Sequence, residues 1–356
     1  MKQIKDFIEL FEKNSILTEH NCNEELSVEM ISYNSMEIQE NTLFFCKGAH
    51  FKEQFLFDAL NKGAVAYVSE KKYDTDAPCI LVSDIRKSMY LSANFFYDNV
   101  WDKLNLVGIT GTKGKTTTTY LVKSILEAAG IKTGLIGTIE SIIGDKHIPS
   151  VNTTPESFVV QEMFAEMVKA GLDAVVMEVS SQALMLHRVS GFTFDIGVFT
   201  NLEPDHIGTN EHKDFDDYMH CKSLLFQQCK KGIFNGDSEH LEGILKGHTC
   251  DVETFGYGEE NDLRATNIEL LNEKGALGVK YHANGLVDYD VEVNVPGSFS
   301  VYNSLTAIAI CHHFGVEEDA IKQAGIEPSA RAESLDVAAF VRLANVCESL
   351  QAKSEA

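Results

Sequence analysis

Residues 107–120, which read VGITGTKGKTTTTY, decide the fold of this chain. An apolar, strand-like run at 104–110 leads into the glycines, and a helical pattern follows at 115–129. The strict phosphate-loop pattern G-x-x-x-x-G-K-[ST] requires a glycine where this sequence has Ile109. Glycines, a lysine and four threonines nevertheless coincide at one strand–helix junction, where free N–H groups and the helix dipole favour anions. We therefore predict a phosphate site with unusual spacing.

The flanking segments place this loop in an α/β architecture. Three later apolar runs alternate with helical segments, at 173–179, 194–201 and 231–237. This alternation predicts βαβ units and a parallel sheet, which binds ligands at the carboxyl ends of its strands. Residues 1–100 read as a separate small α/β unit. Paired strand-like runs with Gly turns occupy 251–295, before a helix at 301–314.

The composition narrows the possible functions. The 356 residues are long for one domain, and 44% are hydrophobic, enough for proper cores. A formal charge of -23 argues against nucleic acid as a partner. The eight cysteines form no C-x-x-C pair, so we expect reduced thiols and a cytoplasmic protein. No apolar run is long enough for a membrane span, and the N-terminus does not resemble a signal peptide.

Polar residues at the ends of the predicted strands suggest a metal–nucleotide site. Lys115 can place a charge on the β- and γ-phosphates, and the Thr116 hydroxyl can bind Mg²⁺. Glu178 ends the run DAVVME, where a carboxylate facing the loop would bind Mg²⁺ as well. Asp205 and His206 follow a third strand in NLEPDHIG. Because parallel strands end at one edge, we expect these groups to converge there.

Five ordered motifs resemble the Mur ligase family, and specifically the MurE-type synthetases. Those enzymes add the third amino acid to UDP-N-acetylmuramoyl-L-alanyl-D-glutamate. The resemblance runs from about residue 25 to 320, and that family's loop, G-T-x-G-K-[ST], accounts for the spacing. The motifs are GITGTKGKTT at 108–117, NTTPES at 152–157, MEVSSQAL at 177–184, FTNLEPDHIG at 199–208 and YMHCKSLLF at 218–226.

The resemblance implies a role for each matching position. ATP would be held by Gly111, Thr112, Lys113, Gly114, Lys115, Thr116, Thr117 and Asn303. Mg²⁺ would be held by Thr116, Glu178, His206 and, if it is carbamylated as in the family, Lys222. The UDP-muramoyl dipeptide would be held by Asn152, Thr153, Thr154, Ser180 and Arg188, with Ser35, Ala49, His50 and Phe51 at its uridine end. Catalysis is thereby assigned to Lys115, Glu178, His206 and Lys222.

The implied reaction is ATP-dependent amide formation in peptidoglycan precursor synthesis. The γ-phosphate activates the glutamyl carboxylate as an acyl phosphate, and the incoming amine then displaces phosphate. Charge neutralisation by Lys115 and Mg²⁺ dominates such chemistry, so we expect no Ser–His–Asp or Cys–His arrangement. The added amino acid, L-lysine or meso-diaminopimelate, is left open. We expect a monomer that does not bind nucleic acid and does not insert into a membrane.

The sequence departs from the family at single positions and near its end. Leu186 and Gln182 stand where many relatives carry Gln and His, and Ser300 replaces a common Asn. We expect a UDP-substrate domain at 1–100 and a central ATP-binding domain at 101–322. Too few residues follow for the family's third domain. The segment 323–356 is expected to be helical or partly disordered, and part of it resembles the C-terminus of rRNA dimethyladenosine transferases.

This organisation predicts a MurE-type chain that binds nucleotide and UDP-peptide but ligates poorly or not at all by itself. One alternative is a non-catalytic nucleotide- and UDP-peptide-binding remnant, which would bind substrate without releasing phosphate. A folylpolyglutamate-type ligase would share the loop and the carbamylated lysine but would not bind a uridine nucleotide. A generic P-loop NTPase or kinase would act without a UDP-sugar, and it does not predict Lys222 or the run EVSS.

Overall fold

The computed structural model describes residues 2–48, 51–208, 211–273, 276–293, 295 and 297–321. The chain divides into two compact units. The first unit holds Met1–Lys103, Pro155–Val168 and Ala183–Phe192, and the second holds Leu104–Thr154, Lys169–Gln182 and the described residues from Thr193 onward. The sequence predicted one domain at 1–100 and another at 101–322. These bounds leave out of the first domain the later segments Pro155–Val168 and Ala183–Phe192, which belong to the first unit. The predicted tail, 323–356, lies outside the described residues.

The first unit is built on a five-stranded sheet in the order β2-β7-β6-β5-β4, with β2 antiparallel and the others parallel. Its strands are β2 Leu17–His20, β4 Met30–Ser32, β5 Thr42–Phe45, β6 Ala64–Ser69 and β7 Cys79–Val82, and a short pair joins β1 Lys2–Gln3 to β3 Ser27–Val28. Its helices are α1 Ile4–Lys13, α2 Glu53–Asn61, α3 Ile85–Phe96, the 3₁₀ turn Val100–Lys103 and most of α5 Ser157–Lys169.

Strand β5 shows why strands of the first unit are continuous apolar runs in the sequence. Leu43 and Phe45 pack into a core with α1 and α3, whereas Phe44 between them packs with Leu56 and Ala59 of α2. Successive side chains of a strand point to opposite faces, so a sheet covered on both faces needs apolar residues at every position.

The second unit contains an eleven-stranded sheet in the order β11-β10-β9-β12-β8-β13-β14-β15-β16-β17-β18. The central strands from β9 to β16 are parallel, and the pairs at both edges are antiparallel. The strands are β8 Asn105–Thr110, β9 Thr133–Ile136, β10 Glu140–Ile143, β11 Lys146–Pro149, β12 Ala174–Glu178, β13 Phe194–Phe199, β14 Cys229–Asn235, β15 Asp251–Gly256, β16 Leu263–Glu273, β17 Ala276–Gly285 and β18 Asp288–Val293. This topology confirms the predicted parallel-sheet domain.

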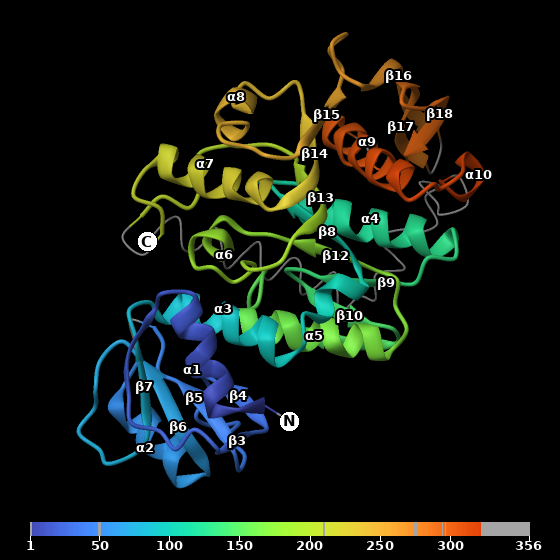
Figure 1. Cartoon of the computed structure of the whole chain (residues 1–356). Helices are drawn as coiled ribbons and strands as arrows, with labels where there is room; N and C mark the ends of the chain where they lie inside the picture. The colour runs from blue at the N-terminus through green and yellow to red at the C-terminus, as the bar shows by residue number, and fades with distance from the viewer. Residues whose placement is uncertain are drawn as a thin grey trace. The chain divides into compact units, whose positions relative to one another are not determined.

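Helices α4 Lys115–Ala128 and α9 Ser298–His313 lie side by side against this sheet (Figure 1). Val122 and Ile125 of α4 share one core with Leu305 and Ile308 of α9 and with the central strands. The remaining elements are α6 Ser181–Met185, whose last three residues belong to the first unit, α7 Phe215–Ser223, the 3₁₀ turn Leu224–Gln227, α8 Leu241–Ile244 and α10 Glu318–Ile321. Of the described helices, none has the length and apolar character needed to cross a membrane.

Candidate active site

The loop between β8 and α4 needs glycine at two positions. Gly111 has φ +153°, and a Cβ there would lie 2.0 Å from Oγ1 of Thr200. Gly114 caps α4 with φ +87°, and its Cβ would lie 2.5 Å from Oδ1 of Asn303. Ile109 is fully buried in β8. The close approach that requires glycine therefore occurs two residues later than the strict pattern places it.

Substituting Gly111 by alanine is expected to lower the free energy of unfolding by roughly 2–4 kcal/mol, because strain at positive φ adds to a steric clash. Gly130→Ala is the matched control: Gly130 has φ +83°, but nothing lies within 4 Å of its added Cβ. Strain alone should cost that variant roughly 1 kcal/mol. Urea unfolding of both variants measures the difference, and equal losses would contradict the predicted clash.

Two lysines converge on the carbonyl of Gly111. Lys115 Nζ donates to Gly111 O at 2.9 Å and to Thr112 O at 3.1 Å, and Lys222 Nζ of α7 donates to Gly111 O at 2.9 Å. Burial lowers the pKa of Lys115. Burial, together with the neighbouring charge of Lys115, holds the pKa of Lys222 well below its ordinary value. Two amino groups therefore lie where a phosphate would bind, and an anion bound there would favour their charged forms.

Glu178 ends β12 with its carboxylate completely buried. It accepts hydrogen bonds from Thr116 Oγ1 at 3.0 and 3.1 Å, from the Thr138 backbone N–H at 2.8 Å and from Thr138 Oγ1 at 3.0 Å. The structure therefore brings two of the predicted Mg²⁺ ligands, Thr116 and Glu178, into contact. Sequence reasoning missed Thr138, although it follows the apolar run of β9 as a strand-end polar residue.

His206, which was predicted to bind the metal with Thr116 and Glu178, pairs with acidic side chains instead. It is half exposed, and its ring pairs with Glu211 at 3.2 Å and Asp205 at 3.7 Å. Within the described part of the chain, its ring nitrogens pair with these carboxylates rather than with Thr116 or Glu178. Its role as a metal ligand stays a prediction.

Residues predicted to hold substrate lie beside Glu178 in the second unit. Thr154 Oγ1 donates to Glu178 O at 2.9 Å and accepts from the Ser180 N–H at 3.0 Å. The hydroxyl oxygens of Thr153 and Thr138 lie 3.1 Å apart, within hydrogen-bond distance. Asn152 is exposed next to them. The NTTPES and EVSS motifs are therefore joined at the carboxyl end of β12.

The other predicted substrate residues belong to the first unit. The Ser35 carbonyl accepts from Lys62 Nζ at 2.7 Å, and the Phe51 ring packs on Phe44 and Tyr73. Arg188 pairs with Glu156 at 3.2 Å. Ala49 and His50 lie outside the described residues.

Two residues of the FTNLEPDHIG motif hold the phosphate loop, although sequence reasoning gave them no role. Asn201 accepts from the Lys113 N–H at 2.8 Å and donates to the Lys113 carbonyl at 3.0 Å. Thr200 Oγ1 donates to the same carbonyl at 2.8 Å.

The remaining predicted ATP contacts lie around the start of α4. Thr112 Oγ1 lies 3.2 Å from the Tyr218 hydroxyl, and Thr117 is exposed at the start of α4. Asn303 accepts from Thr118 at 3.4 Å.

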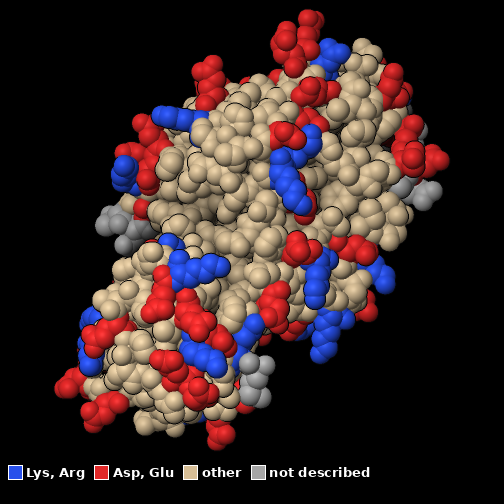
Figure 2. Space-filling model, in the orientation of Figure 1, with Lys and Arg blue, Asp and Glu red and all other residues tan. Residues whose placement is uncertain are grey.

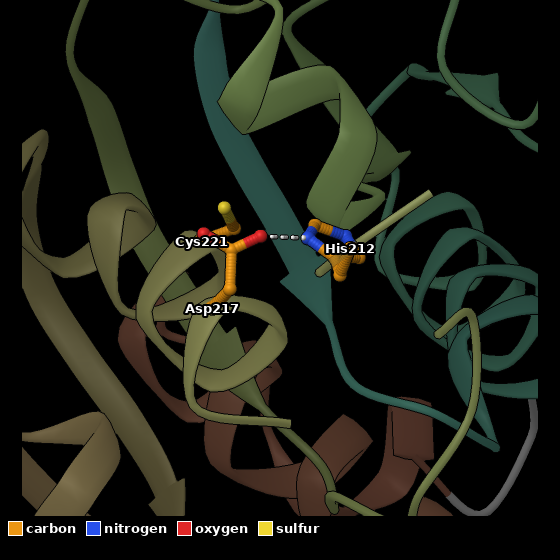
Figure 3. A group of neighbouring side chains, drawn as sticks. All are labelled: His212, Asp217 and Cys221. Carbon is orange, nitrogen blue, oxygen red and sulfur yellow. Dashed lines mark hydrogen bonds and ion pairs between the residues drawn. The ribbon is translucent and has the colours of Figure 1, made fainter. Parts of the chain in front are cut away.

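A buried histidine, His212, lies beside Asp217 and Cys221 of α7 (Figure 3) and also contacts Ser181, the first residue of α6. His212 Nδ1 contacts Asp217 Oδ2 at 3.1 Å, and His212 Nε2 contacts Ser181 Oγ at 2.8 Å. These contacts follow the Ser–His–Asp order that we did not expect, but Ser181 is only 3% exposed and so unavailable to a substrate.

The same histidine belongs to a group that could hold a metal ion, His212, Asp217 and Cys221. Both ring nitrogens of His212 already contact side chains, Asp217 and Ser181. Burial raises the pKa of Cys221 to about 11, so near neutral pH a metal ion would also have to displace the proton of its thiol. The arrangement is therefore best explained as a structural link between the two helices.

We expect His212→Ala to lower the free energy of unfolding by roughly 2–4 kcal/mol, since it leaves a cavity and buried polar groups without their partner. His147, which is exposed and pairs with Glu140, provides the control. His147→Ala should change stability by less than about 0.5 kcal/mol. Thermal and urea unfolding measure both, and a neutral His212→Ala variant would rule out this structural role.

Comparisons with known proteins agree with this geometry. A sequence model of the Mur ligase middle domain matches residues 109–311. The chain is 41% identical to UDP-N-acetylmuramoyl-L-alanyl-D-glutamate--2,6-diaminopimelate ligase 1 of Clostridium acetobutylicum over 83% of this chain and 61% of that protein. It is 36% identical to the UDP-N-acetylmuramoyl-L-alanyl-D-glutamate--L-lysine ligase of Streptococcus pneumoniae serotype 2 over 91% of this chain and 67% of that protein.

A solved structure of a UDP-N-acetylmuramoyl-L-alanyl-D-glutamate--2,6-diaminopimelate ligase is also similar, with a TM-score of 0.77 and 20% identity over 90% of this chain and 65% of the other. The fold and site define a phosphate-loop α/β protein. The chain belongs to the Mur ligase family, which confirms the resemblance predicted from the five motifs. It spans about three fifths to two thirds of the length of these relatives.

Proposed function

We propose that this protein is the ATP-dependent ligase that joins L-lysine or meso-diaminopimelate to UDP-MurNAc-L-Ala-D-Glu in peptidoglycan precursor synthesis. The relatives named above carry one or the other of these activities in their names. One observation carries the proposal: Glu178 joins the phosphate loop through Thr116 and the substrate motifs through Thr154. A nucleotide site and a second-substrate site that meet at one residue, through its carboxylate and its backbone carbonyl, suit transfer of a phosphoryl group between two bound molecules.

The residues of the loop fit the phosphates of ATP. Backbone N–H groups at the start of α4 and the Lys115 ammonium would bind the β- and γ-phosphates. Glycine at Gly111 and Gly114 lets Thr200 and Asn303 pack directly against the backbone of the loop. Asn303 beside Gly114 supports its proposed contact with adenine.

The chemistry of Thr116 and Glu178 fits Mg²⁺. A hydroxyl and a buried carboxylate 3.0 Å apart supply the oxygen donors that Mg²⁺ prefers. Bound there, Mg²⁺ would neutralise charge on the transferred phosphoryl group. His206 is proposed as a further ligand of this ion, and a carbamate on Lys222 as a ligand of a second ion. The short contact of Lys222 with Gly111 places that lysine at the loop, as such a role requires.

In the proposed reaction, the protein positions charges and supplies no nucleophile. Lys115 would stabilise negative charge as the γ-phosphoryl group passes to the glutamyl carboxylate. Asn152, Thr153, Thr154 and Ser180 would orient that carboxylate, and Arg188 would bind the peptide. The amine of the third amino acid would then attack the acyl phosphate and expel phosphate.

The proposal also includes the absence of a nucleic-acid partner, which the composition of the chain supports. Asp and Glu number 53 against 30 Lys and Arg, and acidic groups are spread over the face shown in Figure 2. This charge balance argues against nucleic acid as a partner. The cytoplasmic location and the monomeric state predicted from the sequence are retained as predictions.

The proposal is tested by phosphate release from ATP in the presence of Mg²⁺, with mass spectrometry of the product. Release that requires both UDP-MurNAc-L-Ala-D-Glu and one of the two amino acids, with formation of the UDP-tripeptide, would establish the ligase. Binding of the UDP-dipeptide without phosphate release would favour the non-catalytic module. Phosphate release that does not require the UDP-dipeptide would favour a generic NTPase. Phosphate release that requires folate would favour a folylpolyglutamate-type enzyme.

A further inference from the structure

Residues 203–208, which lie between β13 and α7, carry the proposed metal ligand His206 and are held at both ends. At the start, the Glu203 N–H donates to Thr112 Oγ1 at 3.0 Å, and the same hydroxyl lies 3.3 Å from the Glu203 carbonyl. At the end, the His212 N–H donates to the His206 carbonyl at 3.0 Å, and the Gly208 N–H donates to the His212 carbonyl at 3.2 Å. The start is therefore fixed to the phosphate loop, and the end is fixed to His212.

The backbone of His206 depends on these contacts. Its φ is +55°, in the left-handed region. A residue with a side chain pays free energy to stay in that region, so the surrounding structure must hold it there. The hydrogen bond from His212 to the carbonyl of His206 is part of that support. A shift of His212 would therefore change the direction in which the imidazole of His206 points.

The side chain of His212 is a firm anchor for this purpose. It is completely buried, with Nδ1 3.1 Å from Asp217 Oδ2 (Figure 3) and Nε2 2.8 Å from Ser181 Oγ. A carboxylate only accepts, so Nδ1 carries a proton, and Nε2 of the neutral ring accepts from the Ser181 hydroxyl. The Tyr218 ring lies 5.1 Å from the His212 ring and 6.1 Å from the His206 ring, centre to centre. These neighbours leave the His212 ring one orientation.

We propose that His212 is a positioning residue that acts through His206: it holds the backbone of that residue in place relative to the phosphate loop, and Ser181 and Asp217 hold His212. This inference rests on the metal site of the proposed function and extends it. The sequence gave neither His212 nor Ser181 a role in the site. The substitution that tests the anchor most cleanly is Ser181→Ala, because it removes one hydroxyl and leaves the imidazole and its bond to Asp217.

Calorimetric titration of ATP into the purified chain over a range of Mg²⁺ concentrations provides the main measurement. It gives the Mg²⁺ concentration at which the gain in ATP affinity is half complete. Ser181→Ala is expected to raise this concentration roughly 3- to 10-fold, as for loss of one hydrogen bond. His206→Ala is expected to raise it at least about 10-fold, as for loss of a metal ligand. ATP binding without Mg²⁺ should match the wild type in both variants.

The double variant shows whether the anchor acts through His206. Substitutions at residues that act as one unit do not add. Ser181→Ala should therefore cause no further rise when it is introduced into the His206→Ala variant. Effects that multiply would show that Ser181 and His212 act independently of His206, and they would overturn the inference. An unchanged Mg²⁺ requirement in Ser181→Ala alone would overturn it as well.

Ser88→Ala is the matched control. Ser88 is completely buried in α3 of the first unit, and its Oγ donates to the Ile85 carbonyl at 2.8 Å, so the control also removes a buried hydroxyl. Its Mg²⁺ requirement should match the wild type. Amide hydrogen exchange without Mg²⁺ or ATP gives a second measurement: Ser181→Ala should speed exchange at Gly208 and His212 roughly 3- to 10-fold. Exchange at the wild-type rate would contradict the anchoring role.

The outcomes separate this inference from the proposed function. Shifts in the Mg²⁺ requirement as expected, in a chain that forms no UDP-tripeptide, would overturn the ligase and support the inference. Formation of the UDP-tripeptide with a Mg²⁺ requirement that Ser181→Ala does not alter would overturn the inference alone. If Mg²⁺ does not strengthen ATP binding by the wild type, the proposed metal site and the inference fail together.

Thermal unfolding checks that each variant is folded. If Ser181→Ala does not fold, Ser181→Cys takes its place, because a thiol has a similar size and is a weaker hydrogen-bond donor. A raised Mg²⁺ requirement in that variant supports the role of His212, and an unchanged requirement opposes it.

Discussion

Lys115→Ala is expected to reduce the affinity of the chain for MgATP by roughly 100-fold, and any ligation by at least as much. The Lys115 ammonium is held over the loop by the carbonyls of Gly111 and Thr112, so it is already positioned for a phosphate. Removing it takes away the cation expected to face the β- and γ-phosphates. Calorimetry with ATP and excess Mg²⁺ measures the change in binding.

The loss should not come from unfolding. Burial lowers the pKa of Lys115, so in its absence the folded state avoids the cost of keeping a charged amine out of water. The free energy of unfolding near neutral pH should therefore equal or exceed that of the wild type. Lys123→Ala, farther along α4, is the control, since Lys123 pairs with Glu127 on the helix and should not affect ATP affinity. Unchanged MgATP binding by a folded Lys115→Ala variant would contradict the assignment of the loop.

Glu178→Gln is expected to abolish the Mg²⁺ dependence of ATP binding and to lower any ligation by roughly 10²–10³-fold, as for other groups that stabilise transition-state charge. The substitution keeps the size of the side chain but removes the charge that would hold the metal. It also turns one acceptor oxygen into a donor facing Thr116 and Thr138. ATP titrations with and without Mg²⁺ measure the effect.

Glu140→Gln is the matched control for this charge change. Glu140 accepts from Tyr120 and pairs with His147, and its side chain is 24% exposed. It should retain the Mg²⁺ dependence of the wild type. If Glu178→Gln still binds ATP more tightly when Mg²⁺ is added, the proposed metal site lies elsewhere.

The central part of the site could be predicted because its residues end buried strands. Each strand, β8 and β12, is an apolar run followed by a polar residue or glycine, and parallel pairing brings those ends to one edge. Thr138 was not predicted as a site residue because the strand before it, β9, is only four residues long. Thr200 and Asn201 were not predicted either, because they contact the backbone carbonyl of Lys113. Such contacts depend on the path of the backbone, which a pattern of side chains does not reveal.

The ion pairs of Glu156 with Lys47, Arg86 and Arg188 could not be predicted from local patterns. Lys47 follows an apolar run and Arg86 lies beside Lys87, and nothing nearby in the sequence indicates a shared partner. Their convergence depends on the return of Pro155–Val168 and Ala183–Phe192 to the first unit. The sequence analysis therefore identified Arg188, through its motif, but not the residues that hold it.

The most direct test of the account is calorimetric titration of UDP-MurNAc-L-Ala-D-Glu into the purified wild-type chain, with cytidine diphosphate as the competing nucleotide. Saturable binding of the UDP-dipeptide, with one site per chain and without displacement by cytidine diphosphate, is the predicted result. No binding by a chain that unfolds cooperatively on heating would contradict the account. Membership of the Mur ligase family would then describe the ancestry of the protein, and the substrate would have to be sought outside the muramoyl peptides.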